Sequence, residues 1–249
     1  MISGIFAEMI PFEAITHSEP ALAHSPMLRA ALLTFEYIEA RGPIELTPSK
    51  ALKRYFVAWA AEAFAWPNYT AADLYAANKV LNEQDFPPLV VLHDLLLSTK
   101  LARHYQGSLQ LTKLGKDLGS KPGELWLLLT RHLLFLTDHS QYSRFDGQFT
   151  RDWLTHLNAI NVEAELGISE AELCATLYGG EASYYRREGY QRGLELYLHV
   201  LRPLCWVGLL AEHITGRGLQ RSELFFKTPL WAAALRLPSD EQVARPTLH

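Results

Sequence analysis

The chain has 249 residues and a formal net charge of −4; 49% of its residues are hydrophobic and 20% are charged. This composition is typical of a globular protein with a sizeable core, and it excludes a disordered or low-complexity chain. The negative net charge argues against a general polyanion binder. Lys and Arg are unevenly spread, however, because residues 88–121 and 183–236 carry an excess of cations.

The N-terminus and the two cysteines predict a cytoplasmic protein. The first residues, MISGIFAEMIPFEA, have no basic region and include Glu8 and Glu13, so they do not form a secretory signal. The most apolar run, LWLLLTRHLLFL, is too short and too interrupted to span a membrane. Cys174 and Cys205 lie in apolar stretches outside any Cys-x-x-Cys pair, so we interpret them as small buried hydrophobes in a reducing compartment.

Residues 26–66 predict a helix, a short strand and a second helix. Ser25-Pro26 supplies an N-cap and a first-turn proline for a helix that ends near Gly42. The segment IELT then alternates apolar and polar residues, which is typical of a strand. Thr47-Pro48 follows, and we expect it to cap a helix through SKALKRYFVAWAAEAFAW.

Residues 67–121 predict two short helices followed by a hairpin. Pro87-Pro88 begins the second helix, PLVVLHDLLLSTK. Two alternating segments then flank the turn Gln106-Gly107-Ser108, and Thr112 caps a further helix. A helix-turn-helix followed by a hairpin is the arrangement of a winged helix.

The second half predicts a helical stretch and then another copy of the same pattern. Residues 121–164 are expected to be helical without a hairpin. In the stretch that follows, Ser169 and Glu172 form a capping box that begins a helix. A long helical run then leads to two strands around Gly216-Arg217-Gly218, and Thr228-Pro229 caps the next helix.

The sequence therefore predicts a mainly α fold that contains multiple winged-helix-like units with short two-stranded antiparallel β-wings. We place these units at residues 26–66, 67–121 and 165–237. The expected organisation is an N-terminal region over 1–121, a helical segment with the third unit over 122–237, and a polar tail over 238–249.

The stretch KVLNEQDFPPLVVLHDLLLSTKLARHYQGSLQLTKLGKDL, with LTPSKALKRYFV before it, resembles a family of uncharacterised bacterial proteins, the plasmid open-reading-frame-three-like group. The resemblance covers about residues 40–120. It implies winged-helix-like units and neither an activity nor catalytic residues. This chain differs by having Pro48-Ser49 where a glycine often follows the Leu-Thr pair.

No standard catalytic, cofactor or metal motif predicts an enzyme. Gly-x-Ser-x-Gly, a phosphate-binding glycine loop and His-Glu-x-x-His are all missing from the sequence. The pairs Glu195/His199 and Asp152/His156 have helical spacing, but such pairs are more often surface or capping interactions than metal ligands. A third group, Asp138, His139 and Asp146, is more typical of turn chemistry. We expect neither a cofactor nor a metal.

Two basic groups are candidate nucleic-acid contacts. The segment SYYRREGYQRG alternates tyrosines with arginines, which suits base stacking and phosphate contact. The second group surrounds the hairpin that ends at Thr112. A charged solvent-facing surface remains the alternative for both. The candidates are Tyr184, Tyr185, Arg186, Arg187 and Arg192 in the first group, and Arg103, Lys113, Lys116 and Lys121 in the second.

Three functions stay open at this point. The first is a non-enzymatic winged-helix protein with a nucleic-acid-associated or regulatory role and DNA as a partner. The second is a scaffold that binds a protein partner or a second copy of the chain. An enzyme is the least favoured. The predicted helix PLVVLHDLLLSTK weakens the first, because it offers only His93, Asp94, Ser98 and Lys100 as polar readers of bases.

Overall fold

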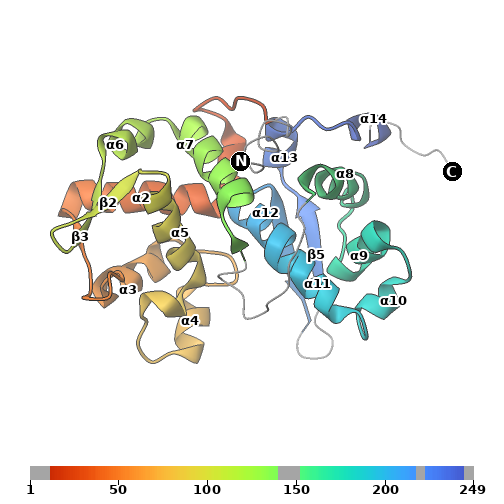
Figure 1. Cartoon of the computed structure of the whole chain (residues 1–249), viewed down its shortest axis with the longest axis horizontal. Helices are drawn as coiled ribbons and strands as arrows, with labels where there is room; N and C mark the ends of the chain where they lie inside the picture. The colour runs from red at the N-terminus through yellow and green to blue at the C-terminus, as the bar shows by residue number, and fades with distance from the viewer. Residues whose placement is uncertain (1–11, 140–151, 217–221, 244–249) are drawn as a thin grey trace. The chain divides into compact units, whose positions relative to one another are not determined.

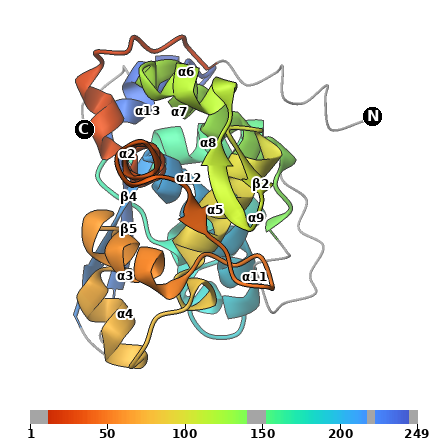
Figure 2. The same ribbon diagram turned by 90° about the vertical axis from the view of Figure 1, so that its left-hand side faces the viewer.

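The structure is a computed structural model that describes residues 12–139, 152–216 and 222–243. Two compact units make up the chain. We call Ile15–Leu133 the N-unit, and Met1–Ala14 together with Leu134–His249 the C-unit. Among the described residues, each unit combines helices with one small antiparallel sheet (Figures 1 and 2; Figure 2 gives the view turned by 90°). The predicted mainly helical fold with short antiparallel strands is thus confirmed.

The N-unit alternates helices with three short strands. In chain order its elements are η1 (Pro20–His24), α2 (Pro26–Arg41), β1 (Ile44–Glu45), α3 (Arg54–Ala63), α4 (Ala71–Ala77), η2 (Glu83–Asp85), α5 (Pro87–Ser98), β2 (Ala102–Tyr105), β3 (Ser108–Leu111), α6 (Lys113–Gly119) and α7 (Pro122–Arg131). The N-cap at Ser25 is confirmed, because its Oγ accepts a hydrogen bond from the Leu28 N–H at 3.2 Å.

One sheet joins two of the units that the sequence predicts separately. Its strand order is β1-β3-β2, and all pairs are antiparallel. Ile44 of β1 pairs with Leu109 of β3, which in turn pairs with His104 of β2. Residues 26–66 and 67–121 therefore share a single sheet. The alternating pattern of β1 gives the buried face of a strand but does not identify its partner.

The first alternating stretch does not lead directly into a helix, so that prediction was wrong. Thr47 closes a turn: its N–H donates to the Ala51 carbonyl at 2.8 Å, and its Oγ1 accepts from the Ala51 N–H at 3.1 Å. Lys50 within this turn has a φ of 66°, which a helix does not allow. The next helix, α3, consequently begins only at Arg54.

Aromatic side chains fill much of the N-unit core. The Phe56 ring of α3 meets the Tyr37 ring of α2 edge-on at 5.0 Å between centres, and Phe64 lies 6.2 Å from Phe86. These three phenylalanines are fully buried, and burial of each contributes about 2–3 kcal/mol. Phe86 immediately precedes α5, so the same packing sets the position of α5 and of the hairpin that follows it.

The C-unit is also built from helices and one hairpin. A π-helical turn (His132–Leu136) spans the boundary between the units in the sequence. The further elements are α8 (Trp153–Glu163), α9 (Glu170–Tyr178), α10 (Ala182–Tyr185), α11 (Tyr190–Leu196), a second π-helical turn (Tyr197–Leu201), α12 (Arg202–Val207), β4 (Leu210–Thr215), β5 (Ser222–Lys227), α13 (Pro229–Ala234) and α14 (Asp240–Val243). The capping box of Ser169 and Glu172 is confirmed.

Both units follow the same order of elements. A helix (α2 or α8) leads to an isoleucine that pairs with the hairpin, then come further helices, and the hairpin closes the series. Ile44 pairs with Leu109, and Ile168 forms the equivalent antiparallel bridge with Phe225. Each partner lies three residues before a threonine that caps the next helix. The C-unit thus repeats the N-unit, with longer strands in its hairpin.

The two cap threonines make matching contacts. Thr112 donates its N–H to Leu101 O at 3.0 Å and its hydroxyl to Lys100 O at 2.7 Å. Thr228 donates its N–H to Leu209 O at 3.1 Å and its hydroxyl to Gly208 O at 2.6 Å. Each hydroxyl also accepts an N–H of the helix that follows.

Replacement of Thr228 by valine tests this junction. Valine keeps the shape but leaves the Gly208 carbonyl and the Leu230 N–H without their partner, so we expect a loss of about 1–2 kcal/mol in the free energy of unfolding. Chemical denaturation measures it. Thr176→Val, at an exposed position of α9, is the control; equal effects of the two variants would contradict the structural role.

Candidate functional site

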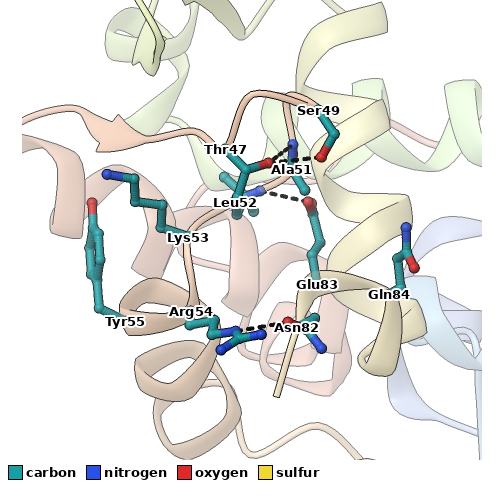
Figure 3. A pocket seen from close by; sticks show the side chains of 10 residues that line it. All are labelled: Thr47, Ser49, Ala51, Leu52, Lys53, Arg54, Tyr55, Asn82, Glu83 and Gln84. Carbon is teal, nitrogen blue, oxygen red and sulfur yellow. Dashed lines mark hydrogen bonds between the residues drawn. The ribbon is translucent and has the colours of Figure 1, made fainter. Parts of the chain in front are cut away.

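A polar pocket of about 590 Å³ lies in the N-unit (Figure 3). Two segments form it: the turn and helix start that follow β1, and the residues around η2. Its lining residues are Thr47, Ser49, Ala51, Leu52, Lys53, Arg54, Tyr55, Asn82, Glu83 and Gln84.

Two hydrogen bonds hold the two sides of the pocket together. The Leu52 N–H donates to Glu83 Oε2 at 2.7 Å, and Arg54 Nε donates to Asn82 Oδ1 at 2.9 Å (Figure 3). The turn at Thr47 brings Leu52 toward η2, and the capping box of Asn82 and Asp85 fixes η2 itself. The pocket is therefore built by local turn chemistry on both sides.

Two cations, Lys53 and Arg54, line the pocket at the start of α3. Lys53 is the residue before α3, and its side chain makes no capping bond there. It pairs instead with Glu45, whose hydrogen bond and charge raise the Lys53 pKa. The positive end of the α3 dipole adds to the exposed charges of Lys53 and Arg54. This arrangement suits an anionic group such as a phosphate.

A buried carboxylate connects the pocket floor to the hairpin. Glu83 and His93 are each 6% exposed, and Glu83 Oε1 lies 2.6 Å from His93 Nδ1. His93 Nε2 lies 2.9 Å from Nε2 of His104, on β2. Leu52, η2, α5 and β2 are thereby linked through side-chain hydrogen bonds.

The outward side of α5 carries little positive charge. Asp94 and Ser98 are exposed, Val90 and Leu97 are half-buried, and His93 points inward to Glu83. This agrees with the expectation from the sequence that most of this helix serves the core. α5 presents few donors that could read base edges.

The four N-unit residues predicted for nucleic-acid binding are all exposed and lie outside the pocket lining. Arg103 lies over the Tyr105 ring at 5.1 Å on the outer face of β2. Lys113 and Lys116 belong to the first turns of α6. Lys121 precedes α7 and lies 3.8 Å from the Glu124 carboxylate.

The five predicted C-unit residues have different environments. Tyr185 is buried and donates its hydroxyl to Gly179 O at 2.8 Å, which is a structural role. Arg186 lies 3.6 Å from Glu172, and Arg192 lies 3.3 Å from Glu195 and over the Tyr178 ring. The other two, Tyr184 and Arg187, are exposed.

The pocket residues were not predicted from the sequence. Lys53 and Arg54 were assigned to a helix interior, whereas they stand at a helix start. The signal that could have found them is the polar run Asn82-Glu83-Gln84-Asp85, which has capping-box spacing immediately before Pro87. The contact between Leu52 and Glu83 spans 31 residues and leaves no local pattern.

The candidate acid and metal pairs have structural surroundings. Asp152 caps α8 through the Thr155 N–H at 3.2 Å, and Glu195 interacts with Arg192. Asp146 of the third group lies outside the described residues. Within the ranges that the structure covers, no group of three or more His, Cys, Asp or Glu is placed to hold a metal ion. None of these residues lines the pocket.

The two cysteines are free thiols with little reactivity. Cys174 is buried and Cys205 is half-buried. Burial, and then the negative charge of Glu170, raises the Cys174 pKa to about 12. Burial also raises the Cys205 pKa. Both thiols are therefore protonated at neutral pH.

Comparison with known proteins identifies the family. The model of the Y4jL N-terminal domain matches residues 23–124, and that of the y4jL C-terminal domain matches residues 143–229. The uncharacterized protein y4jL of Sinorhizobium fredii is 37% identical over 175 residues, which cover 70% of this chain and 80% of the relative. The chain belongs to the y4jL family.

These comparisons bear out the coarser part of the resemblance, which is membership in a family of uncharacterised bacterial proteins. One domain match falls within the N-unit and the other within the C-unit. No solved structure matches the chain. In the part of the chain that is described, none of the helices has the length and apolar character needed to cross a membrane.

Glu170 gives the C-unit a testable pH dependence. A Cβ added to Gly193 of α11 would come within 2.0 Å of Glu170 Oε1, so the Glu170 carboxyl packs directly against that helix. Burial, followed by the charges of Glu223 and Glu212 on the hairpin, raises its pKa from 4.5 to about 7. The folded state thus binds more protons than the unfolded state between these values, and stability falls as pH rises through that window.

Glu170→Gln removes this dependence. We expect the variant to be about 1–2 kcal/mol more stable than the unchanged chain at pH 8, and similar to it near pH 4.5. Denaturant unfolding at both pH values gives the difference. Glu181→Gln, at an exposed position before α10, is the matched control. A gain of the same size at both pH values would contradict the assignment.

Proposed function

We propose that this chain is a non-enzymatic, nucleic-acid-associated protein of the cytoplasm, built from two winged-helix-like units. The observation that carries the proposal is the pocket lined by Lys53 and Arg54 at the start of α3, in a unit whose elements follow the winged-helix order. That order is helix, strand, helices and hairpin, and the first strand pairs with the return strand of the hairpin.

The pocket supports contact with a phosphate backbone. Ser49, Lys53 and Arg54 provide hydroxyl, ammonium and guanidinium donors, and Asn82 and Gln84 add neutral amides. The carboxylate of Glu83 accepts the Leu52 N–H and lies beside His93 Nδ1, and these partners offset part of its repulsion of an incoming anion. Phosphate contacts of this kind position a protein on nucleic acid without reading its sequence.

The composition of α5 favours binding that depends little on base sequence. Its exposed residues include Asp94 and exclude Arg and Lys. Side chains that commonly recognise bases in the major groove are Arg, Lys, Asn and Gln. The wing residue Arg103, stacked on Tyr105, supplies a further cation to the backbone instead.

The C-unit supports a second contact with the same chemistry. Arg186 and Arg187 precede α11, and the neighbouring rings of Tyr184 and Tyr190 are 51% and 56% exposed. Exposed tyrosines near arginines suit the stacking of unpaired bases. Glu172 beside Arg186 lowers the net charge of this surface, as Glu45 beside Lys53 does at the N-unit pocket.

Binding to a labelled duplex and to a single strand of equal length tests the function. We expect affinity for both to fall steeply between about 50 and 200 mM salt, because bound phosphates release counterions. Lys53→Ala with Arg54→Ala removes two contacts and should weaken binding about tenfold or more, with a shallower salt slope. Fluorescence anisotropy measures each affinity.

The control double variant is Arg41→Ala with Arg131→Ala, which removes the same charge from helix ends away from the pocket lining. Equal effects of the two double variants would mean that Lys53 and Arg54 contribute only their charge to the affinity and that the pocket is not a specific contact. Failure to bind both the duplex and the single strand at low salt would exclude the proposed function altogether.

Arg186→Ala with Arg187→Ala tests the C-unit surface. We expect weaker binding to all sequences alike, and a larger loss for the single strand than for the duplex, because the neighbouring tyrosines favour unpaired bases. The same anisotropy assay compares the two substrates. An unchanged affinity would remove this surface from the proposal and leave the pocket untouched.

A protein-interaction scaffold without nucleic acid is the second candidate. The exposed side of α5 favours it, because Val90 and Leu97 are half-exposed there and the charged Asp94 is acidic. Leu166 of the C-unit, 90% exposed, is a further apolar contact point. The scaffold becomes the better account if the binding assay is negative.

A further inference from the structure

The hairpin of the N-unit is joined to α5 by two histidines that meet end to end. His93 Nε2 and His104 Nε2 are 2.9 Å apart, and the ring centres are 5.1 Å apart. The ring centres are about 2.2 Å farther apart than the two nitrogens (5.1 Å minus 2.9 Å), which is close to the sum of the two ring radii. The two Nε2 atoms therefore lie almost on the line that joins the ring centres. Their lone pairs therefore do not converge on a common metal position, and a single hydrogen on this line joins the rings.

Glu83 determines which nitrogen atoms carry hydrogen. Its carboxylate accepts the His93 Nδ1–H through Oε1 and the Leu52 N–H through Oε2. With both rings neutral, His93 keeps its hydrogen on Nδ1, and His104 donates its Nε2–H to the bare Nε2 of His93. A first added proton goes to the remaining bare nitrogen, His104 Nδ1, and leaves the line between the rings intact.

The second added proton has a different effect. It can only enter at His93 Nε2, which then places two N–H groups against each other at hydrogen-bond distance. One charge on the pair is balanced by the Glu83 carboxylate, whereas two charges exceed it. The hydrogen bond between helix and hairpin thus tolerates one added proton and is broken by the next.

We propose that His93 and His104 form a pH-sensitive latch that holds the hairpin of the N-unit on α5 and opens when the pair takes up its second added proton. The charged groups that face it are Glu83 of η2 and Lys50 of the turn after β1. From β1 and β3 the neighbours are apolar, Ile44 and Leu109.

Two further observations support the latch. Burial lowers the pKa of His104, and the charges of His93 and Lys50 lower it further, in the direction that opposes the first added proton and so keeps the pair neutral and closed. In the C-unit, Glu212 stands two residues into its hairpin, where His104 stands in the N-unit. The latch thus belongs to the N-unit and is not a general requirement of this hairpin.

The consequence is local opening at acid pH. When the pair separates, the hairpin loses its contact with α5 while the aromatic core around α2 and α3 stays closed. Because Glu83 also holds Leu52, acidification should loosen the pocket floor as well. The latch itself does not depend on nucleic-acid binding, and it is measured on the protein alone.

Amide hydrogen exchange on the full chain, corrected for intrinsic rates, tests the proposal at pH 7 and pH 5. We expect protection of the β2 and β3 amides to fall about tenfold or more at pH 5, while protection in α2 stays constant. His104→Gln keeps a polar side chain that does not titrate and should remove the pH dependence. His24→Gln, at an exposed position, should behave as the unchanged chain.

Two results would overturn the latch: a pH dependence in His104→Gln equal to that of the unchanged chain, or hairpin protection that is constant between pH 7 and pH 5. Should His104→Gln fail to fold, nitrogen NMR of the imidazoles in the unchanged chain decides. Two separated protonation steps for the pair support the latch, and a single step near the ordinary histidine pKa rejects it.

Discussion

Each unit depends on the hydrogen bonds of one threonine at the junction between its hairpin and the helix that follows. Thr112 and Thr228 each tie the end of the return strand to the carbonyls where the preceding long helix has ended. Those helix ends lie at residues with positive φ, Lys100 and Gly208, so the chain reverses sharply there. The same hydroxyl caps the next helix. One side chain therefore fixes the base of the hairpin. The position of the base in turn determines which residues the inner face of the hairpin contacts.

The sequence predicted this junction at three places, and the structure confirms two of them, Thr112 and Thr228. An apolar alternation that ends in threonine indicates a strand with one buried face and a residue able to cap a helix. At Thr112 and Thr228 both implications are confirmed. At Thr47 the strand is confirmed, but the hydroxyl turns back to the Ala51 N–H. Strand pairing is not local, so the sequence could not show that β1 belongs to the sheet of the following hairpin.

The candidate site was harder to predict because its parts come together only in the fold. The arginine and tyrosine cluster was visible as composition, yet Tyr185 turned out to be buried, since composition does not say which ring faces inward. The pocket depends on contacts between residues far apart in sequence, of which Leu52 to Glu83 is one. A glutamate in a polar run reads as exposed. Only tertiary packing makes it the buried acceptor that links a pocket to a histidine pair.

The two units use the same scaffold with opposite electrostatics beneath the hairpin. In the N-unit the contact is a histidine pair beside a buried carboxylate, and the second added proton of the proposed latch works against it. In the C-unit Glu170 lies near Glu212 and Glu223, so added protons relieve repulsion there. The two units thus share a backbone topology but differ in the charged groups that lie beneath their hairpins. Because acid acts in opposite directions on the two hairpins, the response of the whole chain to pH conceals two separate local responses, and only measurements resolved by residue can distinguish them.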